Sequence, residues 1–272
     1  DPMRLRYADM ERYLALSRVV TGEVMAATFA EWRRPRSTCR GALVWFLRDL
    51  WPGAGWGVFD ASGGWKATAR YLARAFAPLT VNVIDEGLNG LRVHLHNERE
   101  SAFGGKLVFA LHRGETAIAR GEAEVALPAR GSTVLDVAGL FPSFIDTTWA
   151  YRFGPPAHEV AVATLLDEAG RQVAEAFHFP EGLPNERRDD LGLEAKARPE
   201  PDGAFLLTVR AARLAQSVHL DVDGFDASDD YFHVAPGGAR TVRLVPQKPG
   251  QTPRGVIEAL NGRTPAKVTL ET

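Results

Sequence analysis

The sequence predicts a mainly β chain, in which two β-sandwich regions follow a short piece of α/β structure. Segments in which apolar and polar residues alternate recur after Pro78, and turn-forming residues (Gly 26, Pro 17) separate them. Helical spacing of apolar residues is confined to the part before Pro78. Many short alternating segments divided by turn signals are typical of antiparallel sandwiches.

Composition excludes several classes of partner. Lys plus Arg is 32 and Asp plus Glu is 34, so the net charge is −2 and no basic surface for nucleic acid or an anionic membrane is expected. No apolar run approaches the roughly 20 residues that span a bilayer. With a single cysteine, Cys39, no intrachain disulfide can form, and a cytoplasmic or a periplasmic location are both compatible with it.

The first elements are a helix, a strand and a second helix. Apolar or small residues at helical spacing predict a helix over residues 8–32, with Asp9 as its N-cap. The continuous apolar run Gly41–Leu47 is typical of a strand that is covered on both faces. A second helix is predicted over residues 65–77, and Pro78 ends it.

Period-two alternation then predicts strands throughout the rest of the chain. A charged, Pro-containing stretch over residues 179–190 is interpreted as a linker or long connection between two sets of strands. The first set comprises 80–84, 91–96, 106–111, 122–126, 132–136, 159–165 and 172–177, and the second comprises 193–197, 205–211, 218–222, 240–245, 256–260 and 268–270.

The predicted strand Gly41–Leu47 lacks a partner within the first 78 residues. Each buried N–H or C=O group without a partner costs about 1–3 kcal/mol. Over such a strand the cost exceeds the net stability of a domain, about 5–15 kcal/mol. We therefore expect residues 1–78 to be the end of a larger parallel sheet or barrel, whose other strands lie elsewhere. The alternative is that the run pairs with a sandwich strand of its own chain.

Two groups of motifs resemble one family. Gly41–Pro52, Gly55–Asp60 and Gly64-Trp-Lys66 resemble the end of the catalytic barrel in β-mannosidases of glycoside hydrolase family 2. The segment Asp221–Gly237 resembles the last sandwich domain of the same enzymes, and the two matches occur in the family's order. The resemblance implies a helix-strand-helix remnant of a (β/α)8 barrel over 1–78, then two immunoglobulin-like β-sandwiches over 79–180 and 181–272.

The resemblance also implies a function. The parent would be a retaining exo-β-mannosidase, which needs two carboxylic acids about 5–5.5 Å apart. In the family both are glutamates from earlier barrel strands, so we expect no catalytic residue in this chain and no hydrolysis by it alone. Asn97-Glu98 and Asn185-Glu186 look like the family's Asn-Glu motif, but they fall at a strand end and in the linker. Neither pair is expected to be catalytic.

Four residues are candidates for contact with sugar in the intact enzyme: Trp45, Asp49, Trp51 and Trp56. Active sites of barrels lie at the C-terminal ends of strands, where Trp45 is expected, and its indole offers a flat face to a pyranose. The alternatives are that Trp45 packs in a core and that Trp51 and Trp56 seal the barrel mouth. The family also implies a cis peptide at Trp45–Phe46 in an intact barrel, and we expect a trans peptide without one.

Two further functions stay open. A carbohydrate-binding or interaction module needs an exposed aromatic row; Trp149, Tyr151 and Phe153 alternate as such a row would, although an inward core face is the favoured interpretation. The parent could instead be a β-galactosidase or β-glucuronidase of the same family. The expected partner is a β-linked mannoside or other glycan, with self-association through residues 1–78 as an addition, and no cofactor is expected.

Metal binding is not expected either. His94 and His96 share one face of a predicted strand, but no third ligand lies near them in sequence, so a surface pair is the favoured interpretation. An acidic segment could offer oxygen ligands to Ca²⁺ through Asp221, Asp223, Asp226, Asp229 and Asp230. Its spacing matches no EF-hand, and the family resemblance implies a structural turn.

Overall fold

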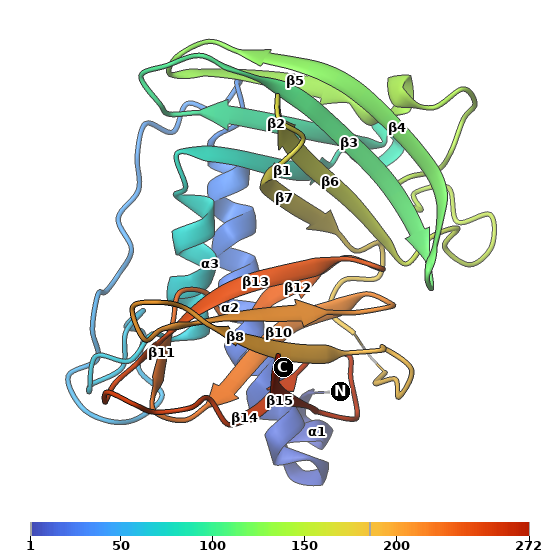
Figure 1. Ribbon diagram of the computed structural model, residues 1–272. Helices are drawn as coiled ribbons and strands as arrows, with labels where there is room; N and C mark the ends of the chain where they lie inside the picture. The colour runs from blue at the N-terminus through green and yellow to red at the C-terminus, as the bar shows by residue number, and fades with distance from the viewer. Residues whose placement is uncertain (1, 185, 272) are drawn as a thin grey trace. The chain divides into compact units, whose positions relative to one another are not determined.

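The computed structural model describes residues 2–184 and 186–271, and it confirms the mainly β fold class (Figure 1). The chain divides into two compact units. Unit 1 contains residues 1–25, 44–71 and 183–272, and unit 2 contains residues 26–43 and 72–182. Asn185, part of one Asn-Glu pair considered above, lies outside the described residues.

Three α-helices lie in the first part of the chain: α1 (Pro2–Ala8), α2 (Met10–Trp32) and α3 (Ala67–Ala75). The two predicted helices are therefore present as α2 and α3, whereas α1 was not expected. Asp9 caps α2, because its Oδ1 accepts the backbone N–H of Arg12 at 3.0 Å.

The β-structure of unit 2 consists of two antiparallel sheets (Figure 1). Their inner faces share one apolar core, in which Leu95, Leu107 and Phe109 are fully buried. Two sheets that bury one face each against a common core form a sandwich. The first sheet has the order β1 (Leu79–Asp85), β2 (Leu91–Asn97), β5 (Gly131–Asp136), and the second has the order β4 (Thr116–Leu127), β3 (Phe103–Arg113), β6 (Val160–Asp167), β7 (Gln172–His178). Short 3₁₀ segments cover Gly87–Asn89 and Val137–Leu140.

The strands of unit 1 are hydrogen-bonded in the order β11-β13-β9-β8-β15-β14-β10-β12. One core cluster holds residues from strands far apart in that order, including Leu244, Ile257 and Phe232, so the sheet closes over a common interior. Among the strands that the structure describes here, β15 and β8 are the pair that runs in parallel. The strands are β8 (Glu194–Pro199), β9 (Phe205–Arg210), β10 (Ala215–Val222), β11 (Phe225–Ala227), β12 (Phe232–Val234), β13 (Ala239–Pro246), β14 (Gly255–Glu258) and β15 (Ala266–Leu270).

The prediction of a buried strand at Gly41–Leu47 is wrong. The run is irregular, and Leu43 and Leu47 are exposed. Its backbone bonds to Val58 and Phe59 lie at its end, where the carbonyl oxygen of Phe46 accepts the Val58 N–H at 3.2 Å and that of Leu47 accepts N–H bonds from Val58 at 3.1 Å and Phe59 at 3.0 Å. A strand needs a neighbour for its N–H and C=O groups, and in the described part of the chain none lies beside this run. The alternative that it pairs with a sandwich strand is also excluded here.

Candidate functional site

The three tryptophans predicted to contact sugar all lie on one irregular segment of unit 1, residues 44–66. Trp45, Trp51 and Trp56 are 78%, 71% and 76% exposed, and together they are called the tryptophan surface below. Large apolar rings exposed to this extent on one segment are candidates for contact with a ligand or another part of a protein.

Asp49 belongs to the same segment but is buried, with 5% of its surface exposed. Its Oδ1 accepts the Gly57 N–H at 2.7 Å, and its Oδ2 forms an ion pair with the Lys66 ammonium group. The Lys66 Nζ also donates to the carbonyl oxygen of Gly55 at 3.1 Å. The hydrogen bond from Lys66, and then that from Gly57, hold the pKa of the Asp49 carboxyl below its usual value. Asp49 is thus a buried carboxylate that links Gly57 to Lys66 within the segment.

Two glycines let the backbone close around Asp49. A Cβ atom on Gly55 would lie 2.5 Å from Asp49 Cγ, and a Cβ atom on Gly57 would lie 2.5 Å from the backbone nitrogen of Asp49. Neither space admits a side chain. Glycine is therefore required at both positions, because the backbone passes too close to Asp49 to leave room for a side chain.

The end of the segment is closed by a second aspartate. Asp60 Oδ1 accepts backbone N–H bonds from Ser62 at 2.8 Å and from Gly64 at 2.9 Å. The next aromatic residue, Trp65, packs edge-to-face on Phe59 at 5.0 Å and carries the Arg70 guanidinium 4.3 Å from its ring centre. Trp65, which is 51% exposed, thus differs from the tryptophan surface in making ring contacts with Phe59 and Arg70.

This arrangement separates two roles. The tryptophan surface offers flat apolar rings of the kind that stack on the C–H face of a sugar. The side chain of Asp49 is buried, and its oxygens bind Gly57 and Lys66. These contacts suit Asp49 to a role in positioning the rings. The Trp45–Phe46 peptide bond is cis, so the expectation of a trans bond in this chain is wrong.

The aromatic segment of unit 2 also differs from expectation. Trp149, Tyr151 and Phe153 lie on an irregular loop over residues 141–158, not on a strand with an inward face. Phe153 is 90% exposed and stacks on Tyr151 at 5.7 Å, and Phe144 meets Tyr151 edge-to-face at 5.6 Å. Asp146 orders the loop by accepting the N–H groups of Ala150 and Tyr151, both at 3.0 Å. The prediction of an inward core row is therefore wrong.

The predicted surface histidine pair is buried. His94 and His96 lie on β2 with 3% and 7% of their surface exposed. Burial lowers the pKa of both, to about 4 for His96. Across the described ranges, no group of three or more His, Cys, Asp and Glu side chains is placed to hold a metal ion.

The acidic segment forms the turn that the resemblance implied. Asp230 Oδ1 accepts backbone N–H bonds from Leu220 at 2.9 Å and Tyr231 at 2.8 Å, and Asp229 pairs with Arg240 at 2.8 Å. In the other Asn-Glu pair, Asn97 is buried at the end of β2 and donates to the carbonyl oxygens of Ser101 and Pro128 at 2.9 and 3.0 Å. These contacts are those of structural turns.

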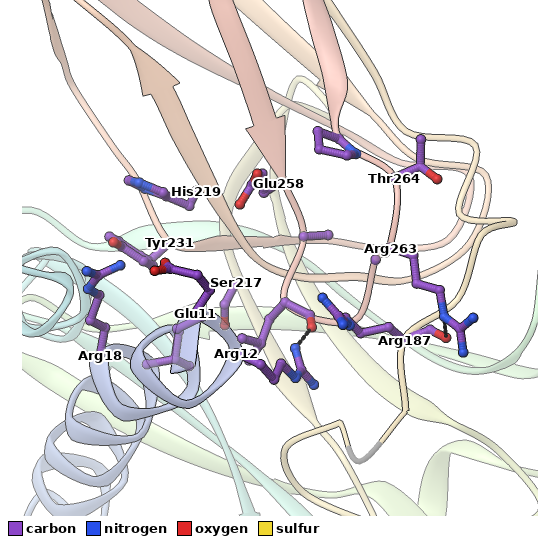
Figure 2. Close-up of a pocket in the computed structure, with 16 residues that line it drawn as sticks. Glu11, Arg12, Arg18, Arg187, Ser217, His219, Tyr231, Glu258, Arg263 and Thr264 are labelled. Carbon is purple, nitrogen blue, oxygen red and sulfur yellow. Dashed lines mark hydrogen bonds between the residues drawn. The ribbon is translucent and has the colours of Figure 1, made fainter. Parts of the chain in front are cut away.

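One group of polar residues was missed by the sequence analysis. Unit 1 contains a cavity of about 170 Å³ whose walls include Glu11, Arg18, His219 and Glu258 (Figure 2). The sequence held one signal, since Glu11 and Arg18 are seven apart and so share a helix face. The sequence alone could not predict that His219 and Glu258 lie opposite each other, because this depends on which strands are neighbours in the sheet.

Comparison with known proteins places these observations in a family context. Residues 190–263 match the Ig-fold domain model of mannosidases. The β-mannosidase B of Aspergillus clavatus is 25% identical over 257 residues, covering 90% of this chain and 30% of the relative. The β-mannosidase B of Neosartorya fischeri is 26% identical over 259 residues, with the same coverage.

Solved structures agree at the level of the fold. A β-D-mannosidase from Dictyoglomus thermophilum matches 97% of this chain and 31% of its own, with a TM-score of 0.76 and 19% identity. An exo-chitosanase from Amycolatopsis orientalis matches 92% of this chain and 34% of its own, with a TM-score of 0.68 and 18% identity. The resemblance to the C-terminal portion of family 2 β-mannosidases is confirmed, and the chain spans 30% of the length of the curated relatives described above.

In the part of the chain that the structure describes, every helix is too short or too polar to cross a membrane.

Proposed function

We propose that this chain is the C-terminal, non-catalytic portion of a retaining exo-β-mannosidase-like glycoside hydrolase, whose parent removes terminal β-linked mannose. The observation that carries the proposal is the tryptophan surface, held open by Asp49 on a segment that matches the family's motif. The chain would supply one wall of the sugar pocket. The catalytic glutamates would come from the parent's other segments, so the chain alone would not hydrolyse mannosides.

The proposal also assigns a role to each part of the chain. Residues 1–78 would complete the catalytic barrel, and residues 79–180 and 181–272 would form two scaffold sandwiches. Trp45 would stack on the sugar ring, and Trp51 and Trp56 would extend the apolar wall beside it. Asp49, bonded to Lys66, would hold the segment in the conformation that presents these rings.

The test is the effect of Trp45 on turnover by the full-length parent. Trp45→Ala removes the ring that would stack on the sugar, and Trp45→Phe keeps a smaller one. We expect kcat/KM for nitrophenyl β-mannoside to fall about tenfold or more with alanine and less with phenylalanine, since each 1.4 kcal/mol of transition-state binding is tenfold. The exposed Leu88 of unit 2 supplies a control, Leu88→Ala. Unchanged kcat/KM in Trp45→Ala would reject the proposed role.

A second candidate function, a carbohydrate-binding module, gains support from the exposed rings of Phe144, Tyr151 and Phe153. These rings lie on a loop that Asp146 orders, so little conformational entropy would be lost on binding. The experiment is affinity electrophoresis of the chain in mannan. Retardation that disappears in Phe153→Ala and persists in Leu88→Ala would favour this function, and unretarded migration of the unmodified chain would exclude it.

A further inference from the structure

The cavity of unit 1 lies between a helix face and two paired strands, and its lining includes no residue of the tryptophan surface. Helix α2 contributes Glu11 and Arg18, and Figure 2 shows both beside the strands that carry His219 and Glu258. Ala15 lies between Glu11 and Arg18 on the same helix face, and its methyl group leaves the space open. Its volume is about 170 Å³, far above the roughly 10–15 Å³ that one water molecule needs in the same kind of measure, so the space can take one small ring.

The strand side of the cavity is fixed by backbone pairing. His219 on β10 and Glu258 on β14 are direct partners in the antiparallel register, so their side chains project from the same face. Tyr231 stacks on the His219 ring at 4.7 Å with an angle of 15° between the planes. The stacked pair gives the cavity an aromatic wall next to its polar groups.

The imidazole of His219 is held in one orientation. Its Nδ1 lies 3.0 Å from Asp230 Oδ2, and the other oxygen of Asp230 is occupied by backbone N–H groups. Burial lowers the pKa of His219, but the hydrogen bond and charge of Asp230 outweigh this effect and raise it above the usual value. Its Nε2 is left for a further hydrogen bond, and among the described residues it has no partner.

Three further charged groups of the wall have no partner in the part of the chain that the structure describes. Within residues 2–184 and 186–271, no side chain or backbone group forms a hydrogen bond or ion pair with the side chains of Glu11, Arg18 or Glu258. The other arginines of the wall are occupied: Arg12 donates to the carbonyl oxygens of Leu260 and Pro184, Arg187 pairs with Asp9, and Arg263 donates to the carbonyl oxygen of Arg187. One guanidinium group, two carboxylates and the Nε2 of His219 thus line one small space without a partner among the described residues.

This set of groups selects the charge of a ligand. Arg18 can only donate hydrogen bonds, the carboxylates of Glu11 and Glu258 can only accept them, and the Nε2 of His219 can form one more. An anion would meet the carboxylates, and a cation would meet the guanidinium group. A neutral molecule with several hydroxyl groups can satisfy both kinds, because each hydroxyl donates and accepts. An aromatic wall beside such groups also suits the C–H face of a sugar ring.

We infer that this cavity is a binding site for a neutral monosaccharide unit, separate from the tryptophan surface. Arg18 donates to its hydroxyl oxygens, Glu11 and Glu258 accept from its hydroxyl groups, His219 Nε2 forms a hydrogen bond with another hydroxyl group, and the Tyr231–His219 stack lines one side. The site holds one sugar residue and carries out no chemistry on it.

The test is saturation-transfer NMR and calorimetry on the 272-residue chain. The neutral probes are D-mannose, methyl β-D-mannoside and D-glucose, with inorganic phosphate and glycine as charged and zwitterionic probes. We expect weak, saturable binding of at least one neutral sugar. Glu258→Gln and Arg18→Ala should each raise its Kd about tenfold or more, because each removes a hydrogen bond to a charged group. Glu194→Gln, on an exposed side chain of β8, is the matched control and should bind as the unmodified chain does.

A Trp45→Ala variant distinguishes this site from the proposed function. It should bind the sugar with unchanged Kd, whether or not the tryptophan surface serves catalysis. The inference would be overturned if no neutral sugar bound, if only phosphate or glycine bound, or if Glu258→Gln and Arg18→Ala left the Kd unchanged.

Discussion

At the scale of single residues, Gly22 of α2 lies directly against the ring of Tyr71 on α3. A Cβ atom at Gly22 would lie 2.7 Å from Tyr71 Cγ. The ring cannot withdraw freely, because its hydroxyl group donates to Glu23 at 2.9 Å and shares a hydrogen bond with Ser217 at 2.8 Å. Glycine at this position allows helix, ring and strand to meet.

We predict that Gly22→Ala destabilises the chain by about 1–3 kcal/mol, although alanine favours helices over glycine by about 1 kcal/mol. Overpacking against a ring held by two hydrogen bonds outweighs the gain in helix propensity. The measurement is urea unfolding followed by tryptophan fluorescence. Gly41→Ala, where a new Cβ meets nothing within 4 Å, is the control and should change stability little. Equal stability of the two variants would refute the packing argument.

Buried histidines of unit 2 give stability a pH dependence. Burial lowers the pKa of His96 and of His158 to about 4, against about 6.5 in an unfolded chain. Both are neutral when folded, so below pH 6.5 the unfolded state binds more protons. Stability is complete above about pH 6.5 and falls as pH drops towards about 4.

At most about 3 kcal/mol per histidine is lost over that interval, at about 1.4 kcal/mol per pH unit. Denaturant unfolding at pH 7 and pH 4.5 measures the loss. In His158→Gln the difference between the two pH values should shrink. A difference that is the same in the variant and the unmodified chain would show that His158 does not contribute.

At the scale of elements, period-two alternation predicted the strands well, because each strand has one face on an apolar core. The missed strands, β11 and β12, are three residues each, too short to show a period, and adjoin the aspartate-rich turn at Asp229 and Asp230. The prediction of a strand at Gly41–Leu47 was wrong for a different reason. An apolar run forms a strand only where neighbouring strands exist, and the sequence of the run does not state whether they do.

For the candidate site too, local features could be predicted from the sequence, whereas contacts between distant residues could not. Exposure of Trp45, Trp51 and Trp56 agrees with a surface role, but the work of Asp49 depends on Gly57 and Lys66, which lie 8 and 17 residues away. Such contacts require the folded segment. The cavity of unit 1 depends still more on pairing, because β10 and β14 meet only in the finished sheet.

We predict that Asp49→Ala loosens the segment over residues 44–66. Without the carboxylate, Gly57 N–H and the Lys66 ammonium group lose their shared partner. Trypsin should then cut after Arg48 and Lys66 faster than in the unmodified chain, as gel and mass analysis of timed digests will show. Asp223→Ala, at an exposed position in the acidic turn, should leave the digestion unchanged. Equal cutting in both variants would mean that Asp49 does not order the segment.

At the scale of the whole molecule, the tryptophan surface predicts self-association of the chain. Exposed indole rings lose unfavourable contact with water when two copies meet. Sedimentation velocity should show an average sedimentation coefficient that rises with protein concentration. The double variant Trp51→Ser and Trp56→Ser should reduce the rise. A chain that sediments as a monomer at every concentration would contradict this prediction.

The most direct test of the central proposal is turnover of nitrophenyl β-mannoside by the purified 272-residue chain. The proposal places the catalytic glutamates elsewhere in the parent, so release of nitrophenol should not exceed that of buffer. Turnover that is abolished by Glu258→Gln, but not by Glu194→Gln, would contradict it. That result would move the catalytic centre into the cavity of unit 1 and make this chain an enzyme by itself.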